Sequence, residues 1–260
     1  VIVSVTVMML IILGGIGFYV FMEVLRERRF KNFSLHTKLV LIITFALIIS
    51  GALLVLIMEY SNPATLGALS LRDKIMASFF QSVTPRTAGF NTIDTAGLGY
   101  AASLLVIIFM FVGGSPGSTA GGIKTTTTGI ILISTYRLIM GYEDIEVLKR
   151  RIDSKTTIRA LSVATISILL VSIVTIILSL TEINSGFTFH DILFEVTSAF
   201  GTVGLSRGLT PNLSNLGRIL ITLTMFVGRI GPLTIAFAIA QGQDKVKGNY
   251  RYPVGKILVG

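Results

Sequence analysis

Two short segments of the sequence repeat one spacing of threonine and glycine. They read Thr-Ala-Gly-Phe-Asn at Thr87–Asn91 and Thr-Val-Gly-Leu-Ser at Thr202–Ser206, and each follows a short apolar stretch. Glycine at the third position opens backbone angles that other residues rarely adopt, so successive carbonyl oxygens can face one axis. Such oxygens can replace the water around a monovalent cation, which predicts two parts of an ion filter.

Six carbonyl oxygens are the candidate potassium ligands, and the next residue of each segment completes the filter lining. Each glycine alone would also suit an ordinary turn after a short helix. The pair at matching places favours the filter interpretation, because chance similarity rarely preserves spacing. The predicted ligands are Thr87, Ala88, Gly89, Thr202, Val203 and Gly204, and the two further lining residues are Phe90 and Leu205.

A glycine-rich stretch from Gly113 to Gly122, with Pro116 inside it, interrupts an otherwise apolar segment. Glycine and proline destabilise helix interiors, so a helix is expected to break here. We interpret the break as a flexible barrier below the filter, and close helix packing through small residues is the alternative. The candidate gate residues are Gly113, Gly114, Ser115, Gly117, Gly121, Gly122, Lys124 and Arg229.

Arg229 lies within a second apolar segment, near the middle of the helix expected there. A charge in such a place is costly unless it has a partner or faces a wet cavity. Arg229 aligns with Gly114 in the internal repeat described below, so it is predicted at the depth of the broken loop. It would impose an electrostatic barrier to cations or hold loop carbonyls by hydrogen bonds, and a buried anchor between helices is the alternative.

The elements that must position these residues are apolar helices. The 260-residue chain is 52% hydrophobic and only 13% charged, with a mean hydropathy of +0.81. This composition is too apolar for a water-soluble domain of its length. Leu98–Thr128 and Ile219–Ala240 are apolar but contain a basic residue each. Three uncharged segments reach the roughly 20 helical residues that cross a bilayer, namely Val1–Met22, Leu39–Met58 and Ala160–Thr181.

The net charge of +9 follows the loops and does not form one face, which argues against nucleic-acid binding. Fifteen of the 22 Lys and Arg lie in Arg26–Lys38, in Arg137–Arg159 and after Gly242, against five in the opposite loops. This positive-inside bias places the three lysine- and arginine-rich segments in the cytoplasm. The chain has no cysteine, so neither a disulfide nor a thiolate metal site is available.

A shift of 115 residues superimposes the two filter segments and also Met110–Gly113 on Met225–Gly228. This register predicts two copies of one unit, each with a spanning helix, a half-length helix, a turn and a returning helix. The half-length helices are expected at Asp73–Thr84 and Phe189–Phe200. The predicted fold class is an all-α membrane protein with tandem helix–pore loop–helix repeats.

The repeat also sets the expected domain boundaries. Residues 38–154 and 155–242 form the two complete copies, and 243–260 form a cytoplasmic tail. Residues 1–37 are expected to hold the returning helix of an earlier, incomplete copy and a cytoplasmic loop. That interpretation places further segments before residue 1.

Four stretches resemble the Trk/Ktr/HKT superfamily of potassium transporters, and especially the membrane subunits of bacterial Ktr uptake systems. The similarity covers nearly the whole chain, and the second stretch is highly specific. The resemblance implies four repeats around one pseudo-fourfold pore, of which two filter glycines lie outside this chain. Some relatives replace one such glycine with serine and admit sodium. The stretches are Ser82–Thr92, Phe111–Thr125, Phe226–Pro232 and Arg251–Gly260.

The resemblance further implies potassium uptake across the bacterial cytoplasmic membrane. Filter glycines would be Gly89 and Gly204, with a gating loop near Gly113–Lys124 and a gate-associated Arg229. It implies a homodimer, with Gly260 near its contacts, whose cytoplasmic face meets a ring of nucleotide-binding regulatory subunits. The nucleotide would bind that partner, sodium would act as a stimulating ion, and no enzymatic activity is expected.

Three other interpretations stay open at this point. The Gly113-x-Ser115-x-Gly117 pattern matches a hydrolase nucleophile elbow, although His36 and His190 are the only histidines that could serve as its base. A sodium-coupled carrier built of parallel repeats shares the broken helices and the internal repeat. A structural role, with the basic loops binding anionic lipid, also fits the charge pattern.

Overall fold

The computed structural model describes residues 1–231, except 143 and 184, together with residue 234. Three predicted features lie outside the described residues, residue 234 apart: the last returning helix beyond residue 231, the tail 243–260 and the dimer contact at Gly260. The elements in chain order are α1 (Ile2–Ile16), α2 (Phe18–Glu27), η1 (Phe30–Asn32), α3 (Leu35–Glu59), α4 (Leu71–Val83), α5 (Tyr100–Phe111), α6 (Thr125–Ile139), β1 (Glu146–Val147), β2 (Arg150–Arg151), α7 (Ser154–Thr181), α8 (Phe189–Gly201), η2 (Thr210–Asn212) and α9 (Asn215–Ile230).

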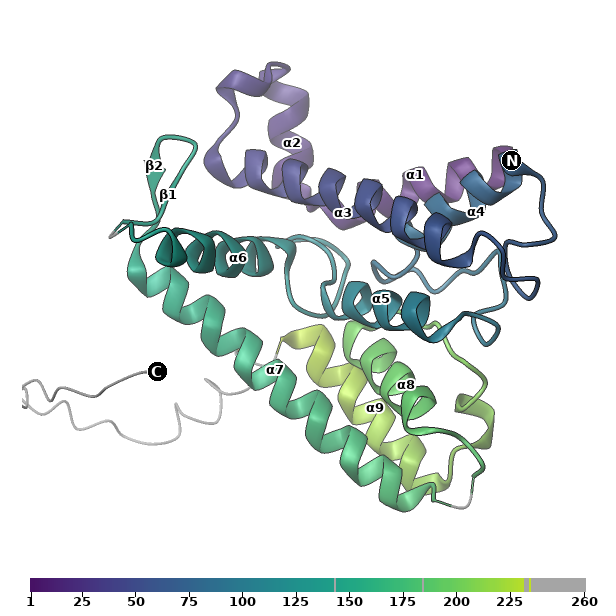
Figure 1. Ribbon diagram of the computed structural model, residues 1–260. Helices are drawn as coiled ribbons and strands as arrows, with labels where there is room; N and C mark the ends of the chain where they lie inside the picture. Colours follow the sequence, from purple (N-terminus) through teal and green to yellow (C-terminus); the bar gives the residue numbers. More distant parts are fainter. Residues whose placement is uncertain (143, 184, 232–233, 235–260) are drawn as a thin grey trace, which may run out of the picture.

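The same order of helices occurs twice along the chain. A long helix, α3 or α7, is followed by a half-length helix, α4 or α8, and then by a returning helix, α5 or α9. In Figure 1, α3 and α4 lie on one side of α5, whereas α8 and α9 lie on the other. Contacts of α5 with α3, α4 and α8 join the two copies. The predicted all-α fold with tandem helix–loop–helix repeats is confirmed.

Two described helices, α3 and α7, are each long and apolar enough to cross a membrane. They contain 25 and 28 residues and cover the segments predicted to span. The returning helix of the first copy is interrupted between Phe111 and Thr125, where the glycine-rich stretch predicted a break. The fold therefore holds irregular backbone between α5 and α6, which a membrane tolerates only inside protein or beside water.

The first segment, expected to cross the membrane over Val1–Met22, is not one continuous helix. The chain bends by 98° between α1 and α2, at Gly17, whose φ is 95°. A side chain at Gly17 would overlap the Pro116 carbonyl oxygen, and the Phe18 amide donates to the Gly117 carbonyl at 3.1 Å. The helix bends because its backbone meets the glycine-rich loop there, a contact that hydrophobicity along the chain cannot predict.

Buried glutamates fix the starts of both returning helices. Glu59, at the end of α3, accepts a hydrogen bond from the Gly99 amide at 3.0 Å, just before α5. Glu182, just after α7, accepts from the Ser214 amide at 3.2 Å and the Ser214 hydroxyl at 2.5 Å, just before α9. A carboxylate at a helix N-terminus satisfies free amides and opposes the helix dipole. Each long helix thus sets the position of its own returning helix.

Replacing Glu59 with glutamine is expected to destabilise the fold. Glu59 is 1% exposed and also accepts from Asn62 Nδ2 at 2.7 Å and from the Thr65 hydroxyl at 2.5 Å. The carboxamide of glutamine offers one acceptor oxygen to three donors, so about 2 kcal/mol of unfolding free energy should be lost. The thermal unfolding midpoint in detergent measures the change. The same replacement at exposed Glu146 is the control, and an equal midpoint for both variants would contradict the role of Glu59.

Candidate functional site

The segment Thr202–Gly204 leaves the end of α8 with all three amides turned back toward that helix. The Thr202 and Val203 amides donate to the Ala199 and Ser198 carbonyls at 2.9 and 2.8 Å. The Gly204 amide donates to the Ser198 hydroxyl at 3.2 Å. Because amides and carbonyls of a residue point in different directions, this arrangement leaves the carbonyl oxygens on the other side of the loop. We call Thr202–Ser206 the second filter loop.

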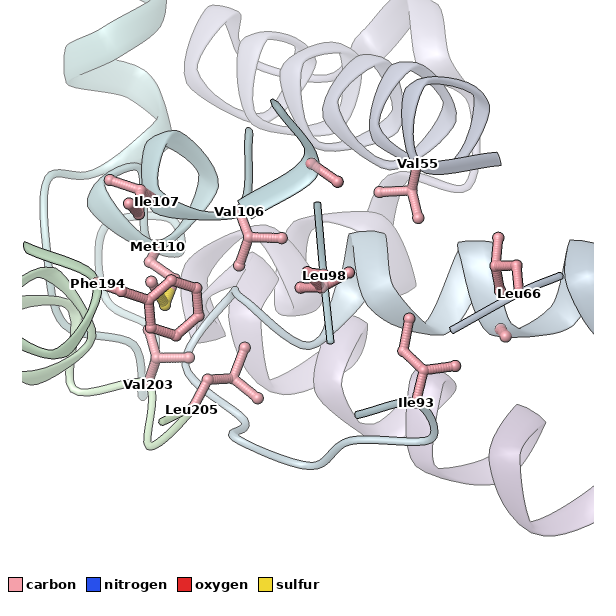
Figure 2. Close-up of a cluster of buried hydrophobic side chains, with 12 residues drawn as sticks. Val55, Leu66, Ile93, Leu98, Val106, Ile107, Met110, Phe194, Val203 and Leu205 are labelled. Atoms are coloured by element: carbon pink, nitrogen blue, oxygen red, sulfur yellow. The ribbon is translucent and has the colours of Figure 1, made fainter. Parts of the chain in front are cut away.

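Two side chains of the second filter loop pack into the protein core. Val203 and Leu205 are each 3% exposed and belong to a buried cluster with Phe194 of α8 and Met110 of α5. Figure 2 shows these side chains pointing toward one another, with Val106 and Leu98 beside them. Burial of an apolar side chain contributes about 1.5–3 kcal/mol, which helps to hold the backbone in place.

The first filter loop, Thr87–Asn91, repeats the backbone conformation of the second. Thr87 and Gly89 have φ of 67° and 74°, and Thr202 and Gly204 have φ of 51° and 93°. In each loop the residue between them keeps an ordinary negative φ. Alternation of the sign of φ turns successive carbonyls toward one side, whereas a regular strand turns them to opposite sides.

The two filter loops lie against each other. A side chain at Gly89 would overlap the Val203 carbonyl oxygen and lie 3.2 Å from the Gly204 Cα. A side chain at Gly204 would lie 3.7 Å from the Gly89 Cα. The two predicted glycines, 115 residues apart in the chain, therefore meet backbone to backbone.

None of the six predicted ligand oxygens accepts a hydrogen bond from the described residues. Most main-chain carbonyls in folded proteins are paired within the protein or with water, so six free ones on two adjoining loops are available to a ligand. A dehydrated monovalent cation is such a ligand, because it needs several oxygens at once. Phe90 differs from its counterpart Leu205, since its carbonyl accepts from the Thr84 hydroxyl.

The glycine-rich stretch between α5 and α6, which we call the gate loop (Val112–Lys124), is closed at its base by backbone hydrogen bonds. The Gly113 amide donates to the Ile123 carbonyl at 2.9 Å, and the Ile123 amide donates to the Phe111 carbonyl at 3.1 Å. The Thr125 amide donates to the Gly114 carbonyl at 3.0 Å. A side chain at Gly113 would overlap the Gly121 carbonyl oxygen, so this pairing requires glycine.

The gate loop lies directly against the second filter loop. A side chain at Gly121 would come within 2.5 Å of the Thr202 hydroxyl and 3.0 Å of the Gly201 carbonyl. The Gly122 amide donates to the Gly228 carbonyl of α9 at 3.3 Å. On its other side, the gate loop contacts α1, where the Ser115 amide donates to the Gly15 carbonyl at 2.9 Å. The loop is therefore held between α1 and α9, next to the filter.

Two cations hold neighbouring carbonyls of the gate loop. Arg229 Nη1 donates to the Thr119 carbonyl, and Lys124 Nζ donates to the Ala120 carbonyl. This contact agrees with the hypothesis that Arg229 bonds loop carbonyls. Among the described residues, Arg229 lies in the last turn of α9, which ends at Ile230. The prediction that it lies near mid-helix involves residues 232–240, which, residue 234 apart, lie outside the described residues. Gly231, with a φ of 97°, ends the helix there.

Ser115 contacts the first residue of α6 and no histidine. It is fully buried, and its hydroxyl lies 2.9 Å from the hydroxyl of Thr125, also buried. Of the two histidines, His190 pairs with Ser103 at 2.7 Å, and His36 lies in the first turn of α3. This geometry does not form the nucleophile and base that a hydrolase needs. Gly117, the last residue of that pattern, has open space around it.

Three ionisable residues near the filter loops, two of them buried and Arg207 half-buried, escaped the sequence analysis. Arg86, 4% exposed, precedes the first loop and donates to the Thr44 hydroxyl at 3.2 Å. Glu195, 5% exposed, lies on α8 behind the second loop. Arg207 forms a 2.7 Å ion pair with Asp191 and donates to the Thr95 carbonyl at 3.0 Å, which joins the segments after both loops. The sequence signal that could have found them is that ionisable residues are rare in or beside apolar segments.

Comparison with known proteins identifies the family. A family model described as TrkH, cation transport protein, matches residues 1–249. The chain is 44% identical over 258 residues to Ktr system potassium uptake protein B of Bacillus subtilis, covering 99% of this chain and 57% of that protein. It is 40% identical over 254 residues to potassium/sodium uptake protein NtpJ of Enterococcus hirae, covering 96% and 56%. The chain thus spans little more than half the length of these relatives.

A solved structure supports the fold. The potassium transporter TrkH from Vibrio parahaemolyticus matches with a TM-score of 0.70 at 17% identity, covering 89% of this chain and 50% of that one. At this identity the likeness concerns the architecture alone. Together with the family match over residues 1–249, it shows that the chain belongs to the TrkH family of cation transport proteins.

Proposed function

We propose that this chain forms part of the conduction path of a membrane protein that takes up potassium ions. The observation that carries the proposal is a set of six carbonyl oxygens on two loops that touch at Gly89 and Gly204, none of which accepts a hydrogen bond from the part of the chain that the structure describes. Main-chain oxygens on alternating backbone angles can replace the hydration shell of potassium. The relatives' names, which specify potassium or potassium and sodium uptake, favour this cation over others.

We further propose that the gate loop obstructs the path below the filter and that Arg229 and Lys124 keep it closed. The support is positional, since Gly121 packs against Thr202 while both cations bond the loop's carbonyls. Residues 38–154 and 155–242 would be the third and fourth of four repeats around the path. The proposed location is the cytoplasmic membrane of a bacterium, and both relatives, from Bacillus subtilis and Enterococcus hirae, are bacterial proteins.

The partners follow from the same family. We propose a homodimer that docks on a cytoplasmic ring of nucleotide-binding subunits, as expected of a Ktr system. The nucleotide would bind to that ring, and sodium would stimulate transport. The basic hairpin of β1 and β2 and the segment 26–38 lie on the side assigned to the cytoplasm by their charge.

Growth of an uptake-deficient bacterium on limiting potassium tests the proposal. The intact protein should restore growth, whereas a Gly204→Ser variant should require roughly tenfold more potassium, because serine strains a backbone at φ 93° by about 1–2 kcal/mol. There is room for the serine Cβ, so the variant should still reach the membrane. Failure of the wild type to restore growth, or equal growth of both at low potassium, would reject the proposal.

A further inference from the structure

A carboxyl group is buried behind the second filter loop. Glu195 lies in the middle of α8 and is 5% exposed. Its Oε2 accepts a hydrogen bond from the Ser206 hydroxyl at 2.8 Å, and its Oε1 accepts from the Thr210 hydroxyl. Both donors belong to the segment that leaves the filter. The carboxyl group therefore holds this segment onto the half-length helix from which the loop began.

The space behind the loop gives these hydrogen bonds their importance. Glu195 and Thr210 line a cavity of about 170 Å³ that also reaches Gly204 and Leu205 of the filter loop. A loop beside a cavity lacks the close contacts that restrain a packed backbone. On the side of the loop that faces this cavity, the Gly204 end is held by hydrogen bonds at Ser198, Ser206 and Thr210, and two of these three involve Glu195.

The other filter loop is held differently. At the shift of 115 residues, Glu195 corresponds to Phe80, a buried aromatic residue of α4. In that copy, the Thr84 hydroxyl bonds the Phe90 carbonyl directly within the loop. Thr84 corresponds in turn to Ala199, which has no hydroxyl. The carboxyl group is thus a feature of one loop and not a requirement of the repeat.

We infer that Glu195 is a positioning residue that sets the ion selectivity of the second filter loop by holding Ser206 and Thr210. This inference rests on the proposed function. Hydrogen bonds to a carboxylate are about twice as strong as those between neutral groups, so they restrict the loop more than a hydroxyl pair would. A filter that holds its oxygens at the spacing of potassium loses discrimination against the smaller sodium ion when the loop relaxes.

Ion fluxes into vesicles that contain the intact transporter test the inference. The experiment measures the flux of rubidium, as a potassium substitute, and the flux of sodium. The proteins compared are the wild type and the variants Glu195→Gln, Thr210→Val and Thr210→Ser. The potassium-to-sodium flux ratio should fall about tenfold in Glu195→Gln, because both hydrogen bonds lose their charged acceptor. It should fall about threefold in Thr210→Val, because one hydrogen bond is lost. Thr210→Ser keeps the hydroxyl and should restore the wild-type ratio.

The matched control is Asp94→Asn, which removes an exposed carboxylate beyond the first filter loop. It should leave the ratio unchanged, which separates the positioning effect from a general loss of negative charge. A wild type without rubidium flux would reject the proposed function itself. A selective wild type with unchanged ratios in Glu195→Gln and Thr210→Val would overturn the inference alone. If Glu195→Gln does not reach the membrane, the flux ratio of Thr210→Val still tests the inference. Thr210 is exposed, and this variant removes one hydroxyl and leaves the carboxyl group in place.

Discussion

Replacing Gly89 with alanine is expected to reduce potassium flux at least tenfold. The methyl group would overlap the Val203 carbonyl oxygen, which is main chain and cannot rotate away as a flexible side chain can. The φ of 74° adds about 1–2 kcal/mol of strain for any L-residue other than glycine. Both effects displace carbonyl oxygens that the proposed function assigns to the ion. The loss should therefore exceed that of Gly204→Ala, where the methyl group has room and strain acts alone.

Potassium flux per folded protein, measured in vesicles that contain the intact transporter, gives this comparison. Gly15→Ala is the matched control, because Gly15 lies in α1 and an added methyl group there meets nothing within 4 Å. The control should conduct as the wild type does. If Gly89→Ala and Gly204→Ala lost flux equally, the close approach of the two loops would not govern conduction.

Replacing Arg229 with glutamine is expected to raise potassium flux about tenfold in the absence of any regulatory partner. The guanidinium group donates to the Thr119 carbonyl of the gate loop, and glutamine is shorter and uncharged. A hydrogen bond from a charged group contributes about 1.5–3 kcal/mol, and 1.4 kcal/mol changes a population tenfold. Lys124 would still bond the Ala120 carbonyl, so a variant of both residues should conduct more than either alone.

Arg218→Gln provides the control for this prediction. Arg218 lies on the same helix, is exposed, and donates to the Pro211 carbonyl at 3.3 Å, near the start of α9. Its replacement removes the same charge far from the gate loop and should leave flux unchanged. Lower yield of folded Arg229→Gln with unchanged flux per protein would assign Arg229 to anchoring helices and not to gating.

The sequence predicted best those features that depend on repetition. Gly89 and Gly204 were identified from one shared offset, and the structure brings their backbones together. The break between Phe111 and Thr125 followed from glycine and proline content alone. These properties are local or periodic, so they can be derived without knowing which segments meet in space.

The features that the sequence did not predict depend on contacts between distant segments. The bend at Gly17 arises where α1 meets Pro116 and Gly117, about 100 residues later. Glu59 acts through Gly99, and Glu195 acts only because the chain returns over α8 with Ser206 and Thr210. A lone acidic residue near an apolar segment predicts a loop or surface position equally well. Its partner becomes known only once the chain is folded.

The closed base of the gate loop limits the size of the movement needed to clear the path. Bonds from Gly113, Ile123 and Thr125 keep the end of α5 and the start of α6 together, so only the tip around Pro116–Ala120 has to shift. A displacement of so few residues does not require the helices that cross the bilayer to slide or turn. Motions of short loops take nanoseconds to microseconds, whereas collective helix movements take microseconds to milliseconds. Single-molecule current recordings should therefore contain brief, frequent interruptions within each longer active period.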